Sequence, residues 1–201
     1  MVNREAVKVL ENNLAKRLKL FSKAIDDLSL AAGLSRMPLR HKVFAVDEML
    51  LILIHQMDKL AFEKGIAEDV RATAREELVY NLVDRGITPH RIEDKLAERG
   101  IDLSADVCKE DSSTMNAALT LFLKEASEID AEYGPCTQFA GETPGDDNGM
   151  VNKLATRVLM RWQPEDMVLW RLFIINMAGD VLAHENTVQE DSKALGTFAS
   201  G

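Results

Sequence analysis

The chain has 201 residues, of which 46% are hydrophobic and 28% are charged. This is the composition of a folded globular protein that can bury a sizeable core, so wholesale disorder is excluded. The formal net charge of −9 argues against nucleic-acid binding over the whole surface.

Three features bear on the compartment. Cys108 and Cys136 are the only cysteines, too few for the disulfide framework of a secreted protein. The first residues lack the apolar run of a signal peptide. The most apolar run, Met49 to Ile54, is far shorter than the ~20 residues needed to cross a bilayer. We therefore expect a cytoplasmic protein with no membrane partner.

The first predicted helix runs from Arg4 to about Ala32, because no proline or glycine interrupts this stretch. Apolar residues recur at three- and four-residue steps from Val7 to Leu28, which is the pattern of an amphipathic helix. Arg17 occupies one position in this row, so a simple bundle helix is favoured over a coiled coil. Gly33 is expected to close the helix.

Four more helices are predicted before residue 133. The second helix of the chain is apolar on nearly all sides at residues 49–54 and is expected to lie at the centre of the core. Thr88 and Pro89 form a helix start signal for the fourth. The predicted ranges are Val43 to Lys64, Glu68 to Asp84, residues 89–99, and Ser112 or Ser113 to about Glu132.

Residues 133–149 contain four of the eleven glycines and two of the five prolines, which predicts a long loop. Two further helices are expected after it, from Met150 to Trp162 and from Pro164 past Ala178. The sequence therefore predicts an all-α bundle of about seven helices with no β-sheet. Its expected parts are an N-terminal bundle (1–132), the loop (133–149), a C-terminal helical pair packing on the bundle (150–187) and a flexible tail (188–201).

Positive charge gathers near the N-terminus, where residues 1–42 carry nine bases and four acids. Within this region, residues 28–43 resemble the helix-turn-helix of bacterial DNA-binding regulators, with Gly33 at the turn and apolar residues at Leu28, Ala32, Leu34 and Leu39. The resemblance covers about sixteen residues and implies a recognition helix in the major groove. The basic residues that would contact nucleic acid are Lys16, Arg17, Lys19, Lys23, Arg36, Arg40, His41 and Lys42.

Two positions depart from that pattern. Pro38 disfavours helical geometry at Met37, and Lys42 stands where the motif prefers an apolar residue. The alternative interpretation is a helix end followed by a basic loop. A second helix-turn-helix interpretation, with residues 85–89 as the turn, is weakened by acids that alternate with the bases of residues 89–99.

No metal-binding or catalytic motif is recognisable. The four histidines, His41, His55, His90 and His184, do not have the spacings of known metal motifs. A site of two carboxylates and two histidines would require Glu48 and His55 to face Asp180 and His184 across two helices. The sequence has no nucleophile motif and no glycine-rich phosphate loop. We therefore predict no catalytic residue, no metal and no cofactor.

The remaining signal is an apparent excess of apolar surface on the second and seventh helices. It predicts a non-enzymatic protein that acts through protein–protein contacts, as a homo-oligomer or with another subunit. The expected interface residues are Trp162, Met167, Trp170, Phe173 and Met177. The alternative is a DNA-binding regulator that uses the basic N-terminal region.

Overall fold

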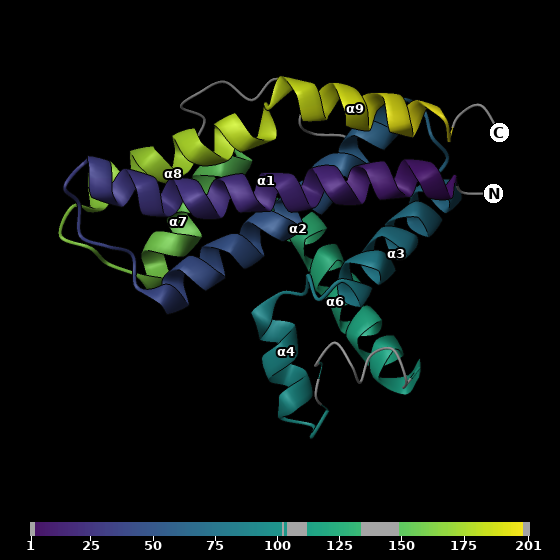
Figure 1. Ribbon diagram of the computed structural model, residues 1–201, viewed down its shortest axis with the longest axis horizontal. Coiled ribbons are helices and arrows are strands. Elements are labelled where there is room, and N and C mark those ends of the chain that lie inside the picture. The colour runs from purple at the N-terminus through teal and green to yellow at the C-terminus, as the bar shows by residue number, and fades with distance from the viewer. Residues whose placement is uncertain (1–2, 102, 104–111, 134–148, 199–201) are drawn as a thin grey trace.

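The computed structural model describes residues 3–101, 103, 112–133 and 149–198, and these residues form eight helices and no strand. The helices are α1 (Arg4–Ala31), α2 (Leu39–Glu63), α3 (Glu68–Asp84), α4 (His90–Ala97), α6 (Ser112–Tyr133), α7 (Met150–Arg161), α8 (Met167–Leu182) and α9 (Glu185–Gly196). The predicted all-α bundle is therefore confirmed. Figure 1 shows α1 across the middle of the molecule, with α8 and α9 on one side and α3, α4 and α6 on the other.

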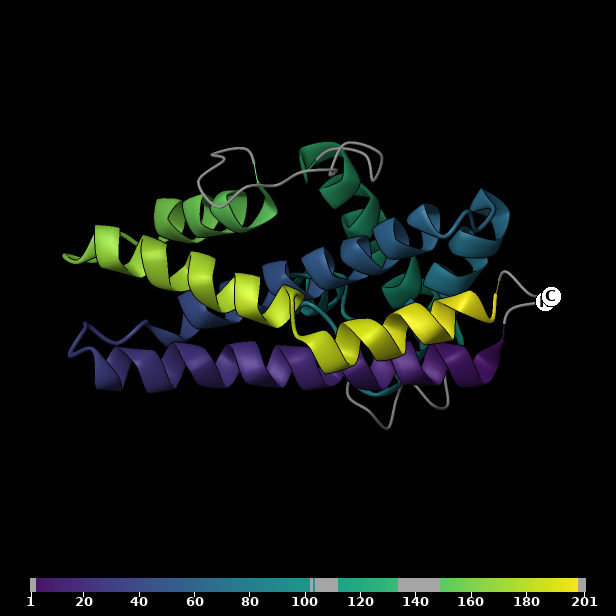
Figure 2. The same cartoon turned by 90° about the horizontal axis from the view of Figure 1, so that it is seen from above.

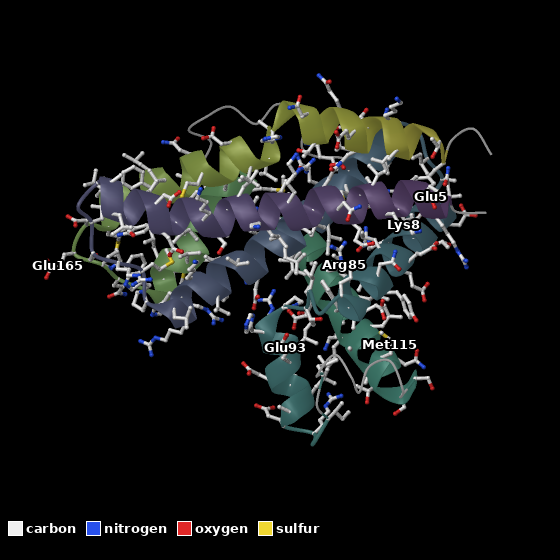
Figure 3. The ribbon with its side chains drawn as sticks, viewed as in Figure 1. Glu5, Lys8, Arg85, Glu93, Met115 and Glu165 are labelled. Carbon is white, nitrogen blue, oxygen red and sulfur yellow. The ribbon has the colours of Figure 1, made fainter. Side chains whose placement is uncertain are left out.

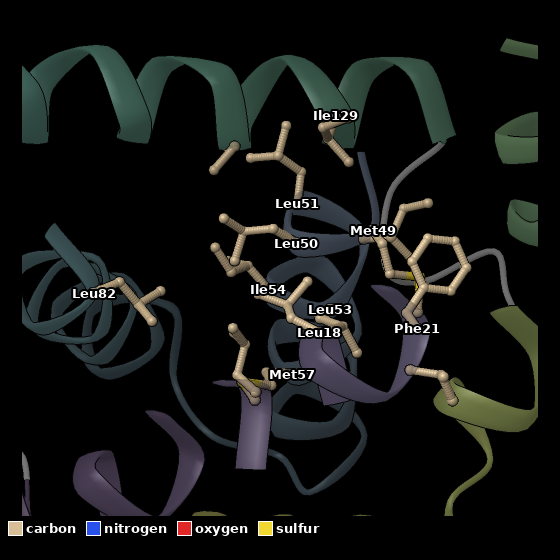
Figure 4. Close-up of a cluster of buried hydrophobic side chains, with 14 of the residues drawn as sticks. Leu18, Phe21, Met49, Leu50, Leu51, Leu53, Ile54, Met57, Leu82 and Ile129 are labelled. Atoms are coloured by element: carbon tan, nitrogen blue, oxygen red, sulfur yellow. The ribbon is translucent and has the colours of Figure 1, made fainter. Parts of the chain in front are cut away.

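The core is built around α2. Every residue from Met49 to Ile54 is at most 3% exposed, because α1, α3, α6 and α7 all pack on this helix. In Figure 4, side chains of α2 lie among Phe21 of α1, Leu82 of α3 and Ile129 of α6. The central position of this helix is confirmed. The excess of apolar surface predicted for the second helix does not lie in this run, since the protomer encloses it.

The segment between α1 and α2 is a link and not a helix-turn-helix. Gly33 ends α1 in the left-handed conformation (φ 64°), and the Leu34 amide donates to the Ser29 carbonyl at 3.1 Å. Residues 34–38 are not helical, and Pro38 stands at the N-cap of α2. Because the residue before a proline avoids helical geometry, no short recognition helix forms here. The helix-turn-helix interpretation of residues 28–43 is therefore wrong.

The C-terminal segment is a helix where a flexible tail was expected. The described part of that tail, residues 188–198, lies in α9 and the two residues after it, and α9 packs along α1 and α2. Its buried row consists of Thr187, Asp191, Ala194, Leu195 and Phe198. Both views show the start of α1 next to the end of α9 (Figures 1 and 2), and the Asn3 side-chain amide donates to the Thr197 hydroxyl at 3.2 Å.

The helices that follow residue 149 share the core of the earlier ones. α7 packs on α2 and α8 packs on α1, and their buried side chains belong to one hydrophobic cluster with those of the N-terminal bundle. The predicted loop lies, apart from its end residues, outside the described residues, as do Cys108 and Cys136. Among the described helices, none alone is both long enough and apolar enough to span a bilayer. Only α8 and α9 taken together meet these two criteria, and a 45° bend separates them.

Candidate protein-interaction surface

One side of α8 is buried in the protomer, and the exposed side is apolar over the first half of the helix. The exposed residues are Val168 (74% exposed), Leu172 (52%), Leu169 (47%) and Met167 (41%), and Met160 at the end of α7 is 75% exposed. We call these five residues the α7–α8 face. Large apolar side chains gathered in this way on a surface make the α7–α8 face a candidate contact site for another molecule.

The face follows from the position of α8 at one end of the molecule. The link between α7 and α8 lies at that end, where the labelled Glu165 projects outward (Figure 3). α8 packs mainly on α7 and α1, so these neighbours cover only the side that carries Trp170 and Ile174. An all-round apolar helix in this position necessarily leaves one side uncovered.

Two hollows adjoin the exposed side of α8. The larger, of about 810 Å³, lies between α2, α7 and α8 and is lined by Leu172, Ile175 and Gly179 among others. The smaller, of about 300 Å³, lies between α7 and the start of α8, where Met160 and Val168 line it. Arg171 borders both hollows, so they form one continuous uneven surface along α8.

Of the five interface residues predicted from sequence, two are enclosed within the protomer. Trp170 is fully enclosed and Met177 is 4% exposed, so neither is available to another chain. Trp170 packs edge-on against Trp162 at a centroid distance of 4.8 Å, and Phe173 packs edge-on against Trp170. Trp162 and Phe173 are half-buried, which leaves Met167 as the one largely exposed member. The large aromatic side chains fill the core, and aliphatic ones remain outside.

Arg17 belongs to a buried polar network between α1 and α9, which removes it from the predicted nucleic-acid contacts. Its guanidinium pairs with Asp191, and both side chains are 0% exposed. Arg17 Nε donates to the Thr187 hydroxyl at 2.8 Å, and Asn13 Nδ2 donates to Asp191 at 2.8 Å. Burial is the main cause that raises the pKa of Asp191 and lowers that of Arg17. Both ions are therefore held where water is excluded.

Two more of the predicted nucleic-acid contacts face inward. His41 is 8% exposed, stacks on Trp162 and accepts a hydrogen bond from Arg40 Nε at 3.1 Å. Burial, helped by the nearby arginines, lowers the pKa of His41. Lys42 is 18% exposed and pairs with Asp26 at 2.6 Å. The remaining five bases, Lys16, Lys19, Lys23, Arg36 and Arg40, lie on the surface.

A second charged network joins four helices around Glu48. This α2 carboxylate is fully buried and lies 2.6 Å from Arg91 of α4 and 2.8 Å from Arg157 of α7. Arg91 also reaches Glu125 of α6 at 2.9 Å, and that carboxylate pairs with Lys95. Each acid in this cluster is neutralised by a cation from another helix. The arrangement fixes the four helices relative to one another.

Within the described residues, no three side chains of histidine, cysteine, aspartate or glutamate come together as a metal site would require. The conceivable two-carboxylate, two-histidine site fails because Glu48 is held by Arg91 and Arg157, while Asp180 is exposed on α8. Comparison of the chain with protein-family models, curated proteins and solved structures finds no match. The α7–α8 face is the candidate functional surface of the described residues.

Proposed function

We propose that this protein is a helical interaction or assembly component that acts through protein contacts at the α7–α8 face. The observation that carries the proposal is the gathering of five large, exposed apolar side chains along α8 and at the end of α7, next to two hollows. Exposed apolar residues elsewhere in the described chain, including Leu30 (80% exposed) and Leu39 (75%), belong to other helices and do not line these hollows.

The size of the face suits a protein partner. The exposed fractions of its five residues together equal about three whole side chains. Full burial of one valine, leucine or methionine side chain contributes about 1.5–3 kcal/mol. Covering the face would therefore gain roughly 5–9 kcal/mol from this chain alone, which is comparable with the lower part of the association cost of about 4–15 kcal/mol.

A photoreactive residue placed at Leu169 tests the proposal. Benzoylphenylalanine at this position, irradiated in cells and in the purified protein, should form a covalent adduct with a protein chain, and Leu172→Glu should abolish it. Tyr80 of α3 is the matched control, because it is 46% exposed against 47% for Leu169 but lies outside the face. Absence of any protein adduct at Leu169, or equal adducts at both positions, would contradict the proposal.

A nucleic-acid role is a second candidate, favoured by one observation. Lys16, Lys19 and Lys23 follow at steps of three and four residues and all lie on the exposed side of α1. If this row binds phosphates, changing all three to glutamate should abolish binding of a mixed-sequence DNA duplex, and wild-type affinity should fall steeply with salt. A wild-type chain that shows no binding even at low salt excludes this candidate.

A further inference from the structure

α8 carries a row of residues with the spacing of a helix–helix seam. Val168, Leu172, Ile175 and Gly179 follow at steps of four, three and four residues, and none of them is fully buried. Such spacing keeps one row of side chains in contact with a neighbouring helix. Among the described residues, no helix of the protomer covers this row at Val168 and Leu172, which are 74% and 52% exposed.

The row carries its most exposed side chain at one end and adjoins the larger hollow at the other. At the N-terminal end of α8, Val168 stands beside Met160 and Met167, all of them exposed. At the C-terminal end, Gly179 lines the 810 Å³ hollow, and a Cβ atom built on this glycine would meet nothing within 4 Å. The exposed Val168 side chain of one copy can meet the larger hollow of a second copy that is turned end for end.

The residue spacing supports the same arrangement. Reversing α8 about the point midway between Phe173 and Ile174 places Val168 opposite the partner subunit's Gly179 and Leu172 opposite the partner subunit's Ile175. Each large residue then meets a smaller or equal one along the row. In this register, each of the four residues of the row lies opposite a residue of the same row on the second copy, as in antiparallel helix pairs.

The charges around the row favour a second copy over a strongly charged partner. The charged residues lining the two hollows are Lys59, Glu63, Arg171 and Asp180, two bases and two acids. The whole chain, in contrast, carries a net charge of −9. Because this region has no net charge, two copies can meet there without the like-charge repulsion that most other surfaces would impose.

We propose that the chain forms a homodimer in which α8 packs antiparallel against α8 of a second copy, about a two-fold axis between Phe173 and Ile174. This inference rests on the proposed function, since it names the partner at the α7–α8 face and its orientation. The projecting Val168 end of each copy enters the hollow beside the other copy's Gly179 end.

Cysteine cross-linking tests the orientation. In a chain with Cys108→Ser and Cys136→Ser, Val168→Cys and Gly179→Cys are made as separate, differently tagged variants and coexpressed. Mild oxidation should give a disulfide between the two variants. Val168→Cys alone should not cross-link, because its two copies lie about 16 Å apart along the helix axes, beyond the ~7 Å that a disulfide spans. A cross-link of Val168→Cys to itself, or none between the variants, overturns the proposal.

Filling the hollow provides a second test. Gly179→Met should leave the protomer folded, because the new side chain meets open space and methionine favours a helix over glycine. It should raise the dissociation constant of the dimer at least tenfold. Gly196→Met in α9 is the matched control, since its added Cβ also meets nothing within 4 Å. Dimerisation unaffected by Gly179→Met contradicts the proposed register.

These outcomes separate the inference from the proposed function. A protein adduct at Leu169 without the cross-link between positions 168 and 179 rejects the antiparallel dimer and leaves the interaction role intact. If benzoylphenylalanine at position 169 forms no adduct with any protein chain, in cells or in the purified protein, the interaction role itself is rejected.

Discussion

The buried ion pair between α1 and α9 offers a sharp test of how the C-terminal helix is held. Asp191→Ala removes the only described carboxylate paired with Arg17 and leaves its guanidinium inside the protein. The same change takes away the acceptor of the 2.8 Å hydrogen bond from Asn13. Arg17 retains only neutral partners, the Thr187 hydroxyl and the Gln56 side chain.

The expected cost is large because both charged side chains are fully enclosed. Removing one partner of a buried pair costs about 3–5 kcal/mol, and the lost hydrogen bond adds about 1 kcal/mol. We expect a total near 4–6 kcal/mol, a substantial part of the ~5–15 kcal/mol by which a domain is stable. The double variant Arg17→Met, Asp191→Leu should recover most of this loss, because an apolar pair of similar volume avoids the desolvation of two ions.

Urea unfolding followed by circular dichroism measures these differences. Asp27→Ala is the control, since Asp27 forms an ion pair with Lys23 at 3.8 Å in which both side chains are more than 60% exposed. Its effect should stay within about 0.5 kcal/mol. If Asp191→Ala costs no more than Asp27→Ala, the buried network does not hold α9 and the reasoning is refuted.

Two further predictions concern the core and its pH dependence. Burial raises the pKa of Asp47 against the opposing effect of His90, so the folded state binds this proton more tightly than the unfolded state. The stabilisation is present at low pH and is lost as the pH rises through the raised pKa. Asp47→Asn should remove that decline in urea melts made at increasing pH from about pH 4, and an unchanged profile would argue against it. Leu53→Ala in the enclosed part of α2 should cost about 2–5 kcal/mol. Val168→Ser, measured on the monomer at low concentration, should change stability by only about 0.5 kcal/mol, and equal effects of the two changes would contradict the assigned burial.

The helices were predictable from local signals because their ends carry strong ones. Gly33 follows the last turn of α1 and Gly65 the last turn of α2, and both adopt the left-handed conformation that ends a helix. The apolar run of residues 49–54 has no polar side, so a central position was the only way to bury it. In each case the information lies within a few residues of the feature.

What the sequence did not reveal depends on distant partners. α9 was missed because its inward row contains Thr187 and Asp191, which are typical of an exposed segment unless Arg17 and Asn13 lie opposite. The same pairing explains an arginine in the apolar row of α1. The sequence did contain a signal for this contact. Arg17 stands in the buried row of α1 and Asp191 in the buried row of α9, and their charges are opposite.

The exposed side of α8 could not be chosen from its sequence for a related reason. A helix that is apolar all round contains no record of which side faces its own protomer. Size suggested the aromatic residues as interface anchors, but the structure places Trp170 inside and leaves Val168 and Leu172 outside. That distribution depends on where α1 and α7 pack.

The mass of the purified protein in solution tests most directly whether a second copy covers the α7–α8 face. Sedimentation equilibrium at micromolar concentration should give about twice the chain mass of 22.4 kDa for the wild type and the single mass for Leu172→Glu. A wild-type protein that remains a monomer throughout this range, with a mass equal to that of the variant, would contradict self-association through α8.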